Sequence, residues 1–147
     1  MSCNTSPLLH GRLVVDKIPC NLIFINNDIG GAMKEFIRVM KALSDPTRLK
    51  LLKILENRLM CVCELQTAIG AAQSTTSKHL KILEDAGLVE SQKDGLWVNY
   101  TLADGKQSPY AATLIGNLRH WLNDELEISS IMENIDKIDR FEILNKN

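Results

Sequence analysis

Residues 60–83 read MCVCELQTAIGAAQSTTSKHLKIL, and the rest of the chain is arranged around them. The first part, about residues 60–69, predicts a short helix that Gly70 ends. Ala71-Ala72 complete a turn of small residues, and a second helix is expected over about residues 74–86. A helix, a tight turn and a polar second helix predict a helix-turn-helix, whose second helix enters the major groove of DNA.

Two strand-like runs follow this motif, Leu88–Lys93 and Leu96–Leu102, and they flank Asp94-Gly95. Asp-Gly between β-prone runs is a strong signal for a hairpin. A hairpin directly after the recognition helix is a wing. The sequence therefore predicts a mainly α protein with a β-hairpin, a winged helix-turn-helix. We expect a homodimer, because specificity in this class comes from a symmetric dimer on a two-fold operator in double-stranded DNA.

The start of the second helix carries the side chains that would read DNA. Short hydroxyls and an amide can meet base edges, and the helix dipole favours a phosphate there. Lysines on the helix and in the wing supply charge for contacts to the DNA backbone. A solvated helix face is the alternative for the polar run alone, but the turn before it and the hairpin after it favour DNA. The predicted DNA-binding residues are Gln73, Ser74, Thr75, Thr76, Ser77, Lys78, His79, Lys81 and Lys93.

Helices are also predicted on both sides of this motif. Residues 34–43 carry an apolar stripe at helical spacing, and a second stripe follows Pro109. Between them, Asp45 can cap a helix that has Pro46 at its first position and runs to about Glu56. The two stripes either form a dimer surface or complete the core of the monomer. The candidate dimer residues are Phe36, Val39, Met40, Leu114, Leu118 and Trp121.

The chain has 147 residues, of which 45% are apolar, which suits one folded domain. We expect an N-terminal extension at 1–32, either disordered or untranslated if synthesis starts at Met33. A DNA-binding and dimerisation domain would occupy 33–122, and an acidic, partly helical tail 123–147. The net charge of −1 does not indicate a nucleic-acid binder by itself, because such domains are usually basic.

The sequence shows neither a membrane-spanning stretch nor a signal peptide, so we expect a cytoplasmic protein. Its four cysteines, Cys3, Cys20, Cys61 and Cys63, should then be thiols suited to metal or redox chemistry.

Cys61 and Cys63 form a C-x-C pair. Residues two apart lie about 200° apart around an ideal helix, so an intact helix would not offer both thiolates to one ion. We therefore expect ion binding to distort the first turn. Thiolates select soft ions: trivalent arsenic or antimony would take two or three sulfurs, whereas cadmium, lead or zinc would prefer more. Two ordinary buried cysteines are the alternative.

Two other classes of protein fit less well. A thiol oxidoreductase would need a strand-then-helix context around its cysteines, and the chain has no other convincing catalytic group. A zinc-stabilised interaction module would need metal to fold. We predict a protein that is not an enzyme and that needs no cofactor to bind DNA.

The chain resembles the ArsR/SmtB family of metal-sensing repressors over about Met33 to Leu122. The resemblance implies a homodimeric winged helix-turn-helix repressor that a metal or metalloid releases from its operator. The form of the cysteine motif resembles the arsenite-responsive members most closely. The motifs that carry the resemblance are ALSDPTR at 42–48, CVCEL at 61–65, SKHLKIL at 77–83, AGLV at 86–89 and GLWVNY at 95–100.

The chain departs from these relatives at one position. Arsenite sensors often carry a third cysteine three residues after the second, and Gln66 stands there in this chain. The third ligand would then be an outside thiol, water, Cys3 or Cys20. The alternative is a cadmium, lead or zinc sensor of the same family that pairs N-terminal cysteines with Cys61 and Cys63.

Overall fold

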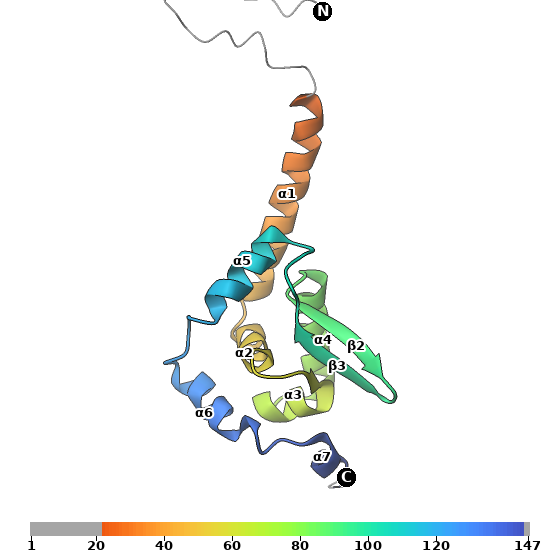
Figure 1. The fold of residues 1–147 in the computed structure, drawn as a ribbon, viewed down its shortest axis with the longest axis vertical. Coiled ribbons are helices and arrows are strands. Elements are labelled where there is room, and N and C mark those ends of the chain that lie inside the picture. The colour runs from red at the N-terminus through yellow and green to blue at the C-terminus, as the bar shows by residue number, and fades with distance from the viewer. Residues whose placement is uncertain (1–21, 146–147) are drawn as a thin grey trace, which may run out of the picture. The chain divides into compact units, whose positions relative to one another are not determined.

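The computed structural model describes residues 22–145, and the side chains from residue 30 onward except that of Leu144. Cys3 and Cys20 lie outside the described residues. Contacts divide the chain into two units, residues 1–34 and 35–147. The elements (Figure 1) are α1 (Leu22–Leu43), α2 (Pro46–Leu55), β1 (Met60–Cys61), α3 (Val62–Ile69), α4 (Gln73–Asp85), β2 (Val89–Asp94), β3 (Trp97–Leu102), α5 (Pro109–Leu118), α6 (Leu126–Ile135) and α7 (Arg140–Asn145).

Helix α1 starts earlier than the apolar stripe at 34–43 indicates. It begins at Leu22 and continues through Gly30 and Gly31. Each glycine costs a helix about 1 kcal/mol relative to alanine, which weakens a helix without forbidding one. None of the helices in residues 22–145 is both long and apolar enough to cross a membrane.

The corner between α1 and α2 forms as the sequence predicts. The Asp45 side chain accepts a hydrogen bond from the Arg48 backbone N–H at 3.0 Å, and Pro46 occupies the first turn. The Arg48 guanidinium turns back and donates to the carbonyls of Lys41 and Ala42, at the C-terminal end of α1. The Arg48 side chain thus caps the C-terminal end of α1, and its backbone N–H is capped by Asp45 at the start of α2.

The helix-turn-helix consists of α3, a three-residue turn and α4. Gly70 ends α3 at φ 67° and ψ 33°, a left-handed conformation that glycine adopts without steric cost. The first helix is shorter at its start than predicted, because residues 60 and 61 belong to a strand. No sequence pattern predicts β1, since two residues are too few for an alternating pattern.

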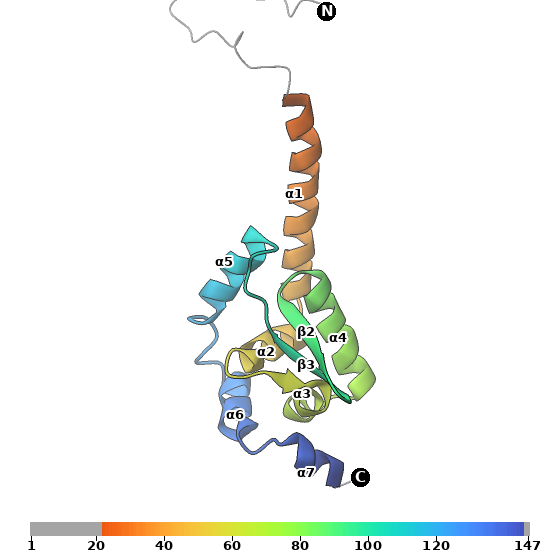
Figure 2. The ribbon, with the colours of Figure 1, turned by 45° about the vertical axis from the view of Figure 1, so that its right-hand side comes forward.

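The wing is an antiparallel hairpin within a three-stranded sheet of order β1-β3-β2. Gly95 and Leu96 form its turn, with Gly95 at φ 59°, one residue later than the predicted Asp94-Gly95, because Asp94 still belongs to β2 and pairs with Trp97. Positive φ in the turn suits a tight hairpin. Figure 2 shows the hairpin alongside α4. Strand β1 pairs with β3 on its other side and so connects the wing to the start of α3.

The core is built around α2, whose last five residues are all buried. One of them is Lys53, which is only 2% exposed. Its Nζ donates to the carboxylate of Glu56 at 2.7 Å, the carbonyl of Leu118 at 3.0 Å and Oδ1 of Asn123 at 2.8 Å. This lysine therefore holds the end of α5 and the following turn against α2.

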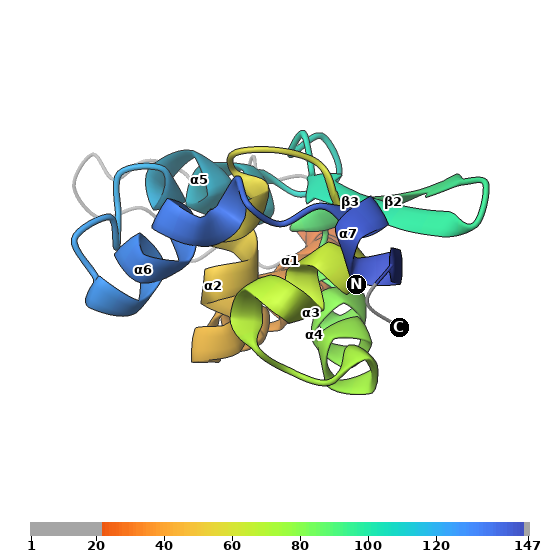
Figure 3. The same ribbon diagram turned by 90° about the horizontal axis from the view of Figure 1, so that it is seen from below.

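The C-terminal residues pack onto the same unit. Figure 3 shows α6 beside α2, and α7 beside α3. Helix α5 ends at Leu118, earlier than the predicted stripe, and Leu122 takes a positive φ of 62° where the chain turns toward α6.

Candidate functional site

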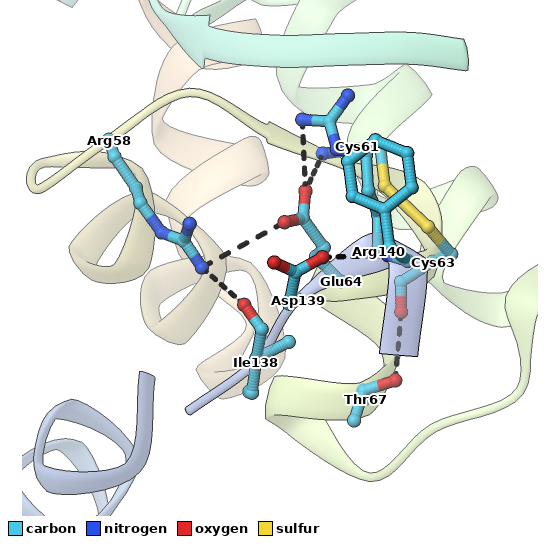
Figure 4. Close-up of a disulfide and its surroundings, with 9 residues drawn as sticks. Arg58, Cys61, Cys63, Glu64, Thr67, Ile138, Asp139 and Arg140 are labelled. Atoms are coloured by element: carbon cyan, nitrogen blue, oxygen red, sulfur yellow. Dashed lines mark hydrogen bonds and ion pairs between the residues drawn. A yellow bond between two sulfur atoms is a disulfide. The ribbon is translucent and has the colours of Figure 1, made fainter. Parts of the chain in front are cut away.

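Cys61 and Cys63 lie together at the start of α3 (Figure 4). The structure joins them in a disulfide with a Cα–Cα distance of 5.5 Å, inside the ordinary range for such bonds. The prediction that an intact α3 keeps the two sulfurs apart is wrong. Cys61 precedes the helix in an extended conformation, φ −81° and ψ 166°, so the angular spacing of helical residues does not apply to it. The expectation of free thiols is likewise not met at this pair.

Glu64 fixes the backbone at Cys61. Its side chain is 3% exposed, and its carboxylate accepts a hydrogen bond from the Cys61 N–H at 2.8 Å. This is half of a capping box, in which the third residue of a helix reaches back to the residue before the helix. Two guanidinium groups balance the buried charge: Arg140 lies 3.3 Å and Arg58 3.8 Å from the carboxylate.

The C-terminal segment closes over this side of the cysteine pair. Arg58 donates to the carbonyl of Ile138 at 2.6 Å and to that of Ile135 at 3.3 Å. The Arg140 guanidinium lies 5.7 Å from the centre of the Trp97 ring, within the range of a cation–π interaction. Sequence reasoning missed this cover, because tertiary contacts between elements far apart in the chain leave no local pattern.

The predicted DNA-reading helix presents a polar face. The exposed residues among the candidates are Gln73, Ser74, Thr75, Lys78, Lys81 and, in the wing, Lys93, while Ser77 is half-buried. Ala72 precedes the helix without a side-chain acceptor, which leaves the first amide N–H groups available to an anion. Hydrogen bonds to Asp85 and Glu84 raise the pKa of Lys81.

Two of the residues predicted to contact DNA, Thr76 and His79, are buried or largely buried in the fold. Thr76 is fully buried and its hydroxyl donates to the carbonyl of Ala72 at 3.1 Å, so the prediction that it contacts DNA is wrong. His79 is largely buried, with Nδ1 3.7 Å from an oxygen of Asp45. Burial would raise the pKa of Asp45, but the hydrogen bond from the Arg48 N–H and the charges of Arg48 and His79 lower it.

The candidate dimer residues separate into two groups. Phe36, Met40 and Trp121 remain 41%, 36% and 50% exposed. Val39 and Leu118 are buried within the chain's own core, so neither can supply surface to a partner, and the prediction is wrong for both. Leu114 lines an apolar cavity of about 300 Å³ between α2 and α5.

The described residues contain no cluster of three or more His, Cys, Asp or Glu that could hold a metal ion. Cys61 and Cys63 are thus the only sequence-predicted ligands that the described part of the chain brings together. Gln66, at the position of a third cysteine in the resemblance, lies one turn further along α3.

A polar helix presented after a tight turn, followed by a hairpin wing, defines a winged helix-turn-helix DNA-binding protein. The family model described as "Bacterial regulatory protein, arsR family" matches residues 45–91. The chain is 34% identical over 100 residues to the arsenical resistance operon repressor of Escherichia coli, covering 67% of this chain and 83% of that protein. It is 33% identical to a cadmium resistance regulator CadC homolog of Staphylococcus aureus, covering 58% and 78%.

Solved structures agree with this fold. A homodimeric winged helix-turn-helix domain of a possible ArsR-family regulator from Mycobacterium bovis matches with a TM-score of 0.55 at 28% identity, covering 67% of this chain and 87% of that one. Reduced HlyU from Vibrio cholerae also matches at 0.55, with 27% identity, covering 66% and 98%. The chain belongs to the ArsR/SmtB family of transcriptional regulators. This family and fold are those of DNA-binding regulators and not of enzymes.

Proposed function

We propose that this protein represses transcription from an operator and leaves the DNA when trivalent arsenic or antimony binds the thiolates of Cys61 and Cys63. The observation that carries the proposal is the meeting of both cysteines at the start of α3, the first helix of the helix-turn-helix. The similarity to the arsenical resistance repressor of E. coli supports the choice of inducer.

The position of the pair suggests how binding would release DNA. Arsenic binds the reduced pair and spaces the two sulfurs further apart than a direct bond does. Cys61 is held in the sheet and Cys63 in the helix, so spreading them moves the start of α3 relative to the wing. Helix α3 packs on α4, and the movement reaches the helix that would read DNA. The inducer then acts through its different affinity for two conformations.

The DNA contacts in this proposal come from the exposed residues at the start of α4 and from the wing. Gln73, Ser74 and Thr75 would face base edges and phosphates, and Lys78, Lys81 and Lys93 the backbone. A second copy of the chain would meet the first through Phe36, Met40 and Trp121, whose exposed area the fold leaves free.

Fluorescence anisotropy tests the proposal. Full-length protein, reduced with a phosphine that does not bind arsenic, is titrated onto labelled DNA from upstream of its own gene at a stated salt concentration, and then with arsenite. We expect arsenite to release the DNA. Cys61→Ser and Cys63→Ser should abolish release while leaving DNA binding intact, and Cys3→Ser and Cys20→Ser serve as matched controls. A reduced protein that never binds DNA would contradict the repressor function itself.

A cadmium or lead sensor is the second candidate, and the similarity to the CadC homolog favours it. These cations prefer more sulfur ligands than two, so Cys3 or Cys20 would have to contribute. The same titration with cadmium separates the two candidates. Release by cadmium and not by arsenite, lost in Cys3→Ser or Cys20→Ser, would establish the alternative.

A further inference from the structure

Asn99 has a buried polar group that the fold leaves without a partner. The side chain is 5% exposed, and its Oδ1 atom is fully buried without a hydrogen-bond partner among the described residues. Buried carbonyl oxygens in folded proteins almost always accept a hydrogen bond. An unsatisfied acceptor of this kind points to a missing donor.

The missing donor would lie next to the cysteine pair. Asn99 is directly opposite Cys61 in the antiparallel pairing of β1 with β3. Opposed residues in such a pair project from the same face of the sheet, with Cβ atoms about 4.5–5.5 Å apart. Trp97, two residues earlier on β3, projects from this face as well, and the Arg140 guanidinium lies over its ring. Cys61 is only 1% exposed, so neither its side chain nor that of Asn99 has much access to water.

We propose that Oδ1 of Asn99 accepts a hydrogen bond from the hydroxyl that remains on arsenic once Cys61 and Cys63 hold it. This inference rests on the proposed function. Arsenous acid carries three hydroxyl groups on trivalent arsenic. Each thiol forms one sulfur–arsenic bond, its proton joins the departing hydroxide, and two waters leave with no change in oxidation state. The third hydroxyl stays on arsenic and is a hydrogen-bond donor.

This arrangement explains how two cysteines suffice where Gln66 replaces a third. The neutral Oδ1 of Asn99 does not have to coordinate arsenic, because it accepts a hydrogen bond from the hydroxyl group that stays on arsenic.

Two arsenicals separate this role from a structural one. Phenylarsine oxide also takes two thiols, with loss of one water, but keeps a phenyl group where arsenous acid keeps its hydroxyl. Binding to the reduced full-length protein is measured for both compounds by the ultraviolet absorbance of the arsenic–sulfur bonds. We expect Asn99→Leu to weaken arsenous acid about five- to tenfold, the value of one buried hydrogen bond, and not to weaken phenylarsine oxide.

Two further variants keep the test decisive. Asn99→Ala should give the same pattern if leucine fits poorly, and Thr101→Val, on the same face of β3, should leave both affinities unchanged. Unchanged affinity for arsenous acid in both Asn99 variants, or an equal loss for both arsenicals, would overturn the inference alone. Failure of the wild-type protein to bind either arsenical would overturn the proposed function together with the inference.

Discussion

Replacing Lys53 by methionine should destabilise the fold far more than removing any lysine on the surface. Methionine fills much of the same space but takes the lysine donor from three acceptors: the carboxylate of Glu56, Oδ1 of Asn123 and the carbonyl of Leu118, which keeps a hydrogen bond from the Trp121 N–H. Removing one partner of a buried ion pair costs about 3–5 kcal/mol. The Glu56 side chain is 15% exposed and regains some water, so we expect about 3 kcal/mol, or roughly 10 °C in melting temperature.

Urea unfolding followed by far-ultraviolet circular dichroism measures this loss. Lys50→Met is the matched control, since Lys50 lies on the same helix and pairs with Glu127, whose side chain is 74% exposed. That pair should contribute less than about 1 kcal/mol. The double variant Lys53→Met with Glu56→Gln should recover part of the loss, because no charge is then left buried. Equal effects of Lys53→Met and Lys50→Met would refute the reasoning.

Three further predictions concern α4, the cap of α2 and the cover over the cysteines. Lys78→Ala should lower the slope of log affinity for DNA against log salt by about 1 for each phosphate contact, and Lys137→Ala should not. Asp45→Ala should cost about 1 kcal/mol of unfolding free energy, whereas Asp45→Asn keeps the cap. The pKa of Asp45 is lowered in the folded protein, so the carboxylate stabilises the fold more than asparagine does at pH values above the ordinary carboxyl pKa. This extra stability disappears as the pH falls through the pKa of the folded state. A stability difference between wild type and Asp45→Asn that does not change with pH would contradict this. Arg140→Ala should speed alkylation of reduced Cys61 and shift the emission of Trp97, and unchanged rates would show that α7 gives no protection.

Local chemistry made the helix-turn-helix and the wing predictable. Asp45 and Pro46 mark the start of α2, Gly70 marks the end of α3, and Asp94-Gly95 mark the hairpin to within one residue of its turn, each through backbone geometry that a few neighbouring residues determine. The polar start of α4 was predicted in outline. Thr76 was misplaced because a threonine inside a polar run can point inward and satisfy its hydroxyl on its own helix.

The surroundings of the cysteine pair could not be predicted in the same way. Strand β1 has two residues, and only its pairing with β3 holds Cys61 in an extended conformation. Asn99 and Arg140 lie 38 and 79 residues after Cys61 in the sequence, and no periodicity links them to it. A helix over residues 60–69 also predicts the wrong direction for the sulfur of Cys61. This residue lies in β1, one position before α3 begins, so the angular spacing of helical residues does not describe it.

The brevity of β1 limits which insertions and deletions this gene can tolerate. Met60 is fully buried in the hydrophobic core, and Cys61, its neighbour, turns to the opposite face of the sheet. One codon added between Arg58 and Met60 would exchange these faces if it shifted the pairing with β3 by one residue, and would then present a thiol to the core and a thioether to Asn99. Length variants at this junction should therefore survive in steps of two residues, or carry the extra residue in the turn at Glu56 and Asn57.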